Sequence, residues 1–166
     1  FKQNYQQESD QLLRLDSRKT LVDNTKIDIP DTFFKKWLLA TNQDKLTEEE
    51  LEKDLDKYID ELKWMLISNK LMAKYDLKVE NSEIEERAKS LFRNYLYQSG
   101  LGSAEMEANL STFAENYLKA ENGKNYMNLM EQVKGEKVYD AIKDNSEIKE
   151  KEISLDDFQK EAEARS

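Results

Sequence analysis

The sequence predicts an all-α protein of extended shape, and two observations carry that prediction. The 166 residues include only four glycines and one proline, the two residue types that most disfavour the interior of a helix. Apolar residues also recur at steps of three and four along most of the chain, which is the spacing of one helix face. The hydrophobic fraction of 38% is low for a compact globule. It favours helices with much exposed surface, arranged as several hairpins in succession.

The first part of the chain predicts two helices separated by a proline. Residues 1–24 have a modest apolar face and read as the first helix. Pro30 cannot continue a helix and pushes the residue before it towards an extended conformation. A short helix is expected over residues 30–40. Its large side chains form one broad face: Phe33, Phe34, Trp37 and Leu38.

Residues 47–75 predict the longest helix, about 40 Å at a rise of 1.5 Å per residue. Its start is well marked, because Thr47 and Glu50 have the spacing of a capping box. Neither proline nor glycine occurs within these residues. We therefore expect one continuous helix, after a polar loop at residues 41–46.

Three further helices are expected in the second half, beginning near residues 82, 104 and 124. Ser82 and Glu85 have capping-box spacing and predict the start of the first of them. Residues 98–103 hold two glycines and predict a flexible loop. Asn122-Gly123 predicts the end of the second of these helices. Gly135 lies inside the last of the three helices and suggests a bend or a close helix contact.

The end of the chain predicts an extended segment followed by one short helix. Residues 148–153 read as extended. Ser154 and Asp157 have the spacing of a cap for a helix that carries Leu155 and Phe158. The last residues, 161–166, are expected to fray.

The composition excludes several classes of function. The chain has no cysteine and no histidine, so disulfides, thiol nucleophiles, imidazole bases and Cys/His zinc sites are ruled out. A net charge of −9 opposes a nucleic-acid surface. We expect no metal and no cofactor, since the carboxylate pair Glu50/Asp54 and others like it lie in a solvated, lysine-interleaved face. No apolar run reaches membrane-spanning length and no signal-peptide pattern occurs. Catalysis is not expected.

The most informative feature is a large set of apolar residues in the second half, rich in aromatic and methionine side chains. Aromatic and methionine side chains adapt to many partner shapes, whereas the same residues at helical spacing usually form a core. Spacing alone favours the core. Phe92, Tyr95 and Tyr97 point in different directions around one helix, however, and favour an open surface. The set comprises Leu91, Phe92, Tyr95, Tyr97, Met106, Leu110, Phe113, Tyr117, Tyr126, Met127 and Met130.

Four stretches, taken together and in this order, resemble one known family. They are Ile27-Asp28-Ile29-Pro30-Asp31 after the first helix, residues 58–75 with the run Trp64-Met65-Leu66-Ile67, the connector Leu77-Lys78-Val79 before Ser82-Glu83-Ile84, and residues 148–158. The chain is similar to the C-terminal chaperone domain of bacterial trigger factor. The loop at residues 98–103 and the helix after it look longer than the family's pattern.

The resemblance implies a helical body with projecting helical-hairpin arms that hold unfolded or nascent polypeptides without ATP. Residues 1–166 would form a single helical chaperone domain from a longer bacterial cytosolic protein. The ribosome would be contacted only through a separate N-terminal domain, and prolyl isomerisation would belong to a further domain. The expected client-binding residues are Leu91, Phe92, Tyr95, Tyr97, Met106, Leu110, Phe113 and Tyr117, with Phe33, Phe34 and Trp37 as a second, weaker set.

Two alternatives stay open at this point. A helical adaptor or structural protein would use the same apolar faces for one specific partner or for a second copy of itself. A periplasmic, SurA-like helical chaperone would share the binding chemistry but work in another compartment. Neither alternative requires a cofactor, nucleic acid or membrane.

Overall fold

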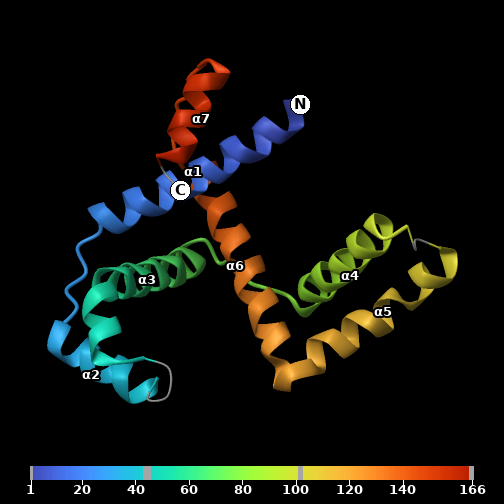
Figure 1. Cartoon of the computed structure of the whole chain (residues 1–166), viewed down its shortest axis with the longest axis horizontal. Helices are drawn as coiled ribbons and strands as arrows, with labels where there is room; N and C mark the ends of the chain where they lie inside the picture. Colours follow the sequence, from blue (N-terminus) through green and yellow to red (C-terminus); the bar gives the residue numbers. More distant parts are fainter. Residues whose placement is uncertain (1, 43–45, 101–102, 165–166) are drawn as a thin grey trace. The chain divides into compact units, whose positions relative to one another are not determined.

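The computed structural model describes residues 2–42, 46–100 and 103–164, and every regular element in them is a helix (Figure 1). The all-α prediction is therefore confirmed. The chain divides into two compact units. Unit 1 comprises Phe1–Lys70 and Glu147–Ser166, and unit 2 comprises Leu71–Ser146. The predicted loops at 41–46 and 98–103 fall partly outside the described residues.

Unit 1 contains α1 (Lys2–Asn24), α2 (Asp31–Thr41), most of α3 (Glu48–Lys74) and α7 (Leu155–Glu163). The bounds of α1 and α2 agree with the predicted helices to within one residue. Figure 1 shows α2 beside the first part of α3.

The apolar core of unit 1 forms where α2 meets α3. Phe34 and Leu38 of α2 are buried together with Leu51 of α3. Partly buried apolar side chains from both helices and from the segments just before each of them surround this core, namely Ile29, Leu39, Leu46, Leu55, Tyr58, Ile59 and Leu62. Because this cluster holds one face of α2 against α3, the opposite face of α2 points outward.

The start of α3 matches the prediction, but its continuity does not. The Thr47 N–H donates to the Glu50 carboxylate at 3.0 Å and the Glu50 N–H donates to Thr47 Oγ1 at 3.3 Å, so the capping box is confirmed. The pKa of Glu50 is lowered first by the bond from the Thr47 N–H and then by a bond from the Thr47 hydroxyl, which donates to the same carboxylate at 2.8 Å.

The expectation of one uninterrupted helix is wrong, because α3 is kinked at Asp54, whose φ and ψ are −112° and 15°. Lys57 donates to the Asp54 carboxylate at 2.7 Å. With this kink, Leu51 before it and Leu55 after it belong to the same cluster with α2. The kink therefore lies within the part of α3 that packs against α2.

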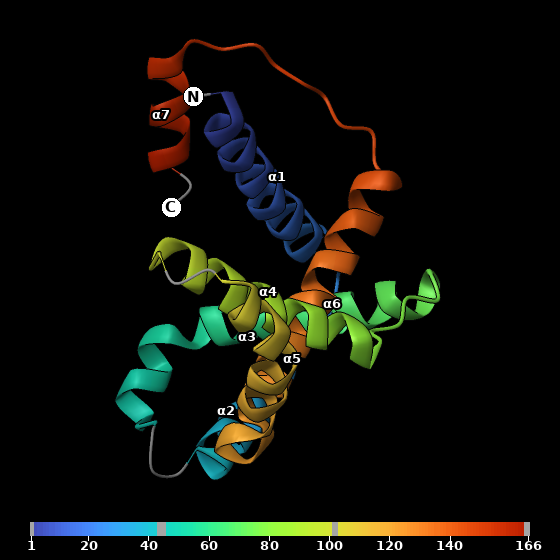
Figure 2. The same cartoon turned by 90° about the vertical axis from the view of Figure 1, so that its right-hand side faces the viewer.

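The C-terminal helix packs on the first helix within unit 1. The rings of Tyr5 in α1 and Phe158 in α7 meet edge to face, with centroids 6.1 Å apart, and Figure 2 shows α7 beside the first half of α1. Ser154 accepts the Asp157 N–H at 3.2 Å, so the predicted cap of α7 is confirmed.

Unit 2 is built from α4 (Asn81–Gln98), α5 (Ala104–Lys119), the short 3₁₀ helix η1 (Ala120–Gly123) and α6 (Lys124–Asp144). In Figure 1, α4 and α5 form a helical hairpin whose open end lies against α6.

The turn between α5 and α6 confirms the predicted stop at Asn122-Gly123. Glu121, Asn122 and Gly123 all have positive φ, at 51°, 56° and 81°. Residues in this left-handed region end a right-handed helix.

The cap of α4 lies elsewhere than the sequence predicts. The helix begins at Asn81, and the Glu80 N–H donates to the Glu83 carboxylate at 2.8 Å. The expected box between Ser82 and Glu85 is therefore wrong. A residue far away in the sequence supports the cap at Glu83, because Lys137 of α6 also binds the Glu83 carboxylate at 2.8 Å.

The sequence suggests a bend or a close helix contact at Gly135, and the second of these suggestions is wrong. A Cβ atom built at this position would meet no atom within 4 Å, and its φ is not in the left-handed region. The residue simply occupies an exposed position inside α6.

Replacing Gly135 with alanine should stabilise unit 2 by about 1 kcal/mol, the difference between their helix propensities. Hydrogen exchange of the α6 amides would measure the change. Gly123→Ala is the control. Its φ of 81° is strained for alanine, so this variant should lose stability. A Gly135→Ala variant that is less stable than the wild type would show that α6 needs the glycine.

Candidate functional site

The helical hairpin of unit 2 is anchored by a small buried core. Ile84 and Ala88 of α4 pack with Ala114 and Leu118 of α5 and with Leu129 of α6. The two alanines are almost fully buried. Because small side chains let helices approach closely, the two alanines allow α4 and α5 to pack at short range beside Ile84 and Leu118.

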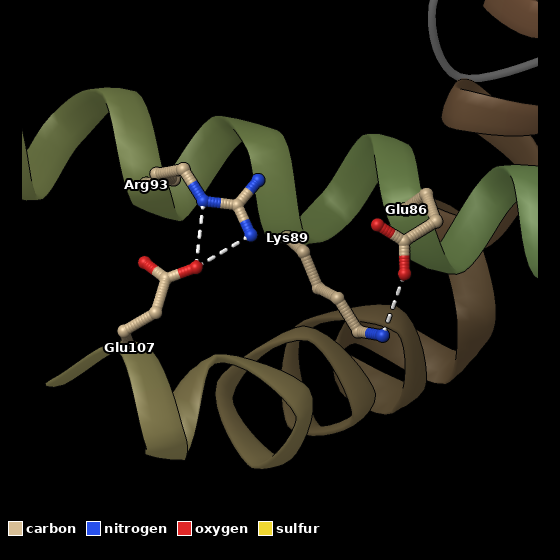
Figure 3. Close-up of polar contacts among 4 residues, drawn as sticks. All are labelled: Glu86, Lys89, Arg93 and Glu107. Carbon is tan, nitrogen blue, oxygen red and sulfur yellow. Dashed lines mark hydrogen bonds and ion pairs between the residues drawn. The ribbon is translucent and has the colours of Figure 1, made fainter. Parts of the chain in front are cut away.

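An ion pair joins the two helices of the hairpin (Figure 3). Arg93 of α4 donates from Nε and Nη2 to Oε1 of Glu107 in α5, at 2.9 and 2.7 Å. The hydrogen bond to Glu107 raises the pKa of Arg93. Nearby, Lys89 binds Glu86 on the same helix at 2.7 Å, a hydrogen bond that lowers the pKa of the Glu86 carboxyl.

Two further ion pairs join α4 to α6. Arg87 binds Glu136 at 2.8 Å, and Lys137 binds Glu83 at 2.8 Å. The pKa of Glu83 is lowered first by the Glu80 backbone N–H and then by Lys137. The core and these pairs make the hairpin an ordered platform for side chains on its outer faces.

Three predicted binding residues form an aromatic cluster on this platform. The ring of Phe92 in α4 lies 6.1 Å from that of Phe113 and 5.6 Å from that of Tyr117, the latter edge to face. Phe92 and Tyr117 are half-buried and Phe113 is exposed. Tyr117 also packs against the core. The cluster therefore presents one exposed ring supported by two others.

Three more predicted residues are exposed on α4. Leu91 and Tyr95 are four residues apart and share one side of the helix, and Tyr95 is 64% exposed. Tyr97 is 68% exposed and points to another side of the helix, since residues two apart do not share a face. The apolar surface of α4 therefore extends around its last two turns.

Leu110 lies inward of this surface, whereas Met106 keeps part of its side chain in contact with solvent. Leu110 is only 2% exposed and Met106 is half-buried. Leu110 therefore does not belong to the exposed surface, because a buried side chain contributes packing and not contact with a partner.

The second predicted set, on α2 of unit 1, divides in the same way. Phe34 is buried in the core of unit 1, and its ring stacks on that of Trp37 at 6.1 Å. Phe33 and Trp37 are exposed on the outer side of α2, Phe33 at 69%. This smaller surface carries two large aromatic side chains.

A pocket of about 700 Å³ lies where α4, α5 and the start of α6 meet. Apolar groups of Ala114, Leu118, Tyr126 and Met127 line one part of it, and the rest of the wall is polar or charged, with Asn81, Ser111, Glu85, Lys89, Glu115 and Lys119. The Tyr126 hydroxyl donates to Asn81 at 2.6 Å, which fixes the ring in the pocket wall. This volume falls in the range that binds small apolar groups.

The sequence predicts Met127 to belong to the large apolar set of the second half but not to the client-binding residues. It is 53% exposed at the edge of this pocket. Helical spacing alone could not reveal this position, because it depends on the turn at η1 that sets α6 against the hairpin.

The described residues expose surfaces of apolar and aromatic character. Among them, no group of three or more acidic, histidine or cysteine side chains is placed to hold a metal ion. In the same residues, every helix falls short of the length and apolar character needed to cross a membrane.

Comparison with models of known protein families finds a match over most of the chain. The family model described as "Probable trigger factor, C-terminal domain" matches residues 9–161. All four stretches that carry the family resemblance lie within these residues. No curated protein and no solved structure matches the chain.

Proposed function

Because the chain belongs to the trigger factor C-terminal domain family, we propose that it holds exposed apolar segments of unfolded or nascent polypeptides on two aromatic surfaces. The family supports a chaperone-type role and the binding of unfolded polypeptide clients. The match is to the chaperone portion of trigger factor, which lacks the prolyl isomerase domain. The surfaces and residues that bind clients are the proposal.

The observation that carries the proposal is the exposure of large aromatic side chains on a packed hairpin. Tyr95, Tyr97 and Phe113 stay exposed although the core beneath them is closed. Contiguous exposed apolar surface of this kind is typical of interaction sites. We assign client contact in unit 2 to Leu91, Phe92, Tyr95, Tyr97, Met106, Phe113 and Tyr117, together with the pocket beside Met127.

Phe33 and Trp37 of unit 1 form the second proposed surface. Burying about 100 Å² of an aromatic ring yields about 2.5 kcal/mol, which gives only weak binding at one surface. Two surfaces on one chain raise the affinity for a long client through effective concentration. Release then needs no ATP, since each contact is weak by itself.

The acidic surface suits this function. A net charge of −9 makes copies of the chain repel one another, so exposed aromatic groups do not drive self-association as readily. Holding would therefore persist at concentrations where a neutral protein with the same patches precipitates.

Three further properties belong to the proposal, and the resemblance implies the first two. The protein would act in the cytosol, and it would reach the ribosome only through a separate N-terminal domain. Dimerisation of the chain is possible through the same apolar surfaces. Sedimentation over a range of concentrations would reveal it.

The proposal is tested by holding activity in the absence of nucleotide. Two unrelated proteins, one all-α and one all-β, are denatured and diluted with increasing amounts of the chain, and light scattering measures aggregation. We expect suppression of both clients near stoichiometric amounts.

Suppression of one client only would favour the adaptor alternative, because a specific adaptor ignores at least one unrelated protein. Suppression of neither would contradict the proposed function. A helical protein of similar size and charge without exposed aromatic residues serves as the control for crowding and charge.

A further inference from the structure

We propose that Met127 is a site of oxidative modification, and that its conversion to the sulfoxide weakens the binding of apolar client segments at the pocket between α4, α5 and α6. The effect on binding rests on the proposed function. The selectivity of the oxidation does not, because it follows from exposure alone.

The five methionines of the chain differ in their access to solvent. Met127 is 53% exposed and Met65 is 47% exposed. Met72, Met106 and Met130 are half-buried. Since oxidation of methionine requires contact between the sulfur and the oxidant, Met127 and Met65 should react first.

The position of Met127 gives its oxidation a consequence. It lines the pocket together with Leu118 and Tyr126. Its thioether is an apolar, adaptable group suited to irregular client side chains. A sulfoxide is polar and chiral, so it would have to lose hydrogen bonds to water when an apolar segment covers it.

The reaction needs a peroxide and no group from the protein. The sulfur lone pair attacks one peroxide oxygen, the O–O bond breaks and an S–O bond forms. After proton transfer the other oxygen leaves as water. The sulfur is oxidised by two electrons and the peroxide is reduced by two.

Oxidation at Met127 should leave the fold intact. The side chain is not part of the buried cluster of Ile84, Ala88, Ala114, Leu118 and Leu129, whereas Met130, one turn later, packs against that cluster. Oxidation of Met127 would therefore change client binding on the surface of unit 2 and leave the stability of unit 2 unchanged.

The test combines mass spectrometry with client holding. The folded chain is treated with hydrogen peroxide for increasing times, and peptide mapping follows each methionine. Binding of a permanently unfolded, carboxymethylated client is measured on the same samples. Met127→Leu keeps an apolar side chain that peroxide cannot oxidise, and Met65→Leu is the matched control in unit 1. Met127→Gln provides a polar side chain without oxidant.

We expect Met127 and Met65 to oxidise before Met130. Client affinity should fall about fivefold in the wild type and in Met65→Leu, but not in Met127→Leu, as expected for the loss of about 40 Å² of apolar contact. Met127→Gln should show the same loss without peroxide.

Three results would overturn the inference: oxidation of Met127 no faster than that of Met130, an equal loss in Met127→Leu, or unchanged affinity after complete oxidation of Met127. If the untreated chain binds no client, the proposed function fails instead, and the order of oxidation still tests the modification site.

Discussion

Replacing Ile84 with alanine should destabilise unit 2 by about 2–5 kcal/mol, the cost of removing a large apolar side chain from a closed core. Ile84 is among the most deeply buried side chains of the chain. It lies in the cluster that holds α4, α5 and α6 together. Loss of its methyl groups leaves a cavity at the point from which the hairpin is anchored, so α4 and α5 should separate from α6 more often.

The measurement must distinguish the two units, because a chain of two units need not unfold in one transition. Both tryptophans, Trp37 and Trp64, belong to unit 1. Their fluorescence therefore reports on unit 1, while hydrogen exchange of peptides from α4, α5 and α6 reports on unit 2. Ile84→Ala should speed exchange in unit 2 and leave the fluorescence transition of unit 1 in place.

Leu91→Ala is the matched control, since Leu91 lies on the same helix and is exposed. It should cost less than about 1 kcal/mol, as surface substitutions usually do. Equal losses for the two variants would contradict the assignment of Ile84 to the core.

The helices could be predicted from the sequence because few glycines and prolines interrupt the apolar periodicity. Features set by distant contacts could not. The kink at Asp54 accompanies the packing of α3 on α2, and the cap of α4 uses Glu83, which Lys137 of α6 also binds. The local sequence predicts another arrangement at both places. It predicts a continuous helix at Asp54 and a capping box at Ser82 for α4.

The candidate surface shows a similar limit. Leu110 and Phe113 follow the same helical spacing in α5, but Leu110 is buried and Phe113 is exposed. Phe33 and Phe34 are neighbours in α2 and also differ in this way. Spacing identifies which residues share a face, whereas exposure depends on how far the neighbouring helix extends along that face.

The substitutions with the largest expected effect on client holding are those of the two most exposed tyrosines of unit 2. Changing Tyr95 and Tyr97 to serine removes two rings that contact solvent over most of their surface. Their loss should weaken binding of an unfolded client about 30- to 900-fold, if each ring contributes about 1–2 kcal/mol through apolar burial. Because neither ring belongs to the core cluster, the fold of unit 2 should be unchanged.

Gln98→Ser is the control for this variant, since Gln98 is a polar, exposed residue at the end of the same helix. It should bind clients as the wild type does. Fluorescence anisotropy with a labelled, permanently unfolded client measures the affinity, and circular dichroism verifies the helix content. Wild-type affinity in the folded double variant would exclude these tyrosines from the client surface.

A comparison of client lengths extends this prediction to the second surface. Phe33→Ser with Trp37→Ser removes the exposed rings of α2. A short peptide occupies one surface at a time, so either pair of substitutions alone should reduce its binding only partly. A long client that spans both surfaces gains from effective concentration, so losing either surface should cost it a larger factor than it costs the peptide. Equal factors for the two clients would mean that the surfaces bind independently, and the multivalent mechanism would then be wrong even though client binding itself is retained.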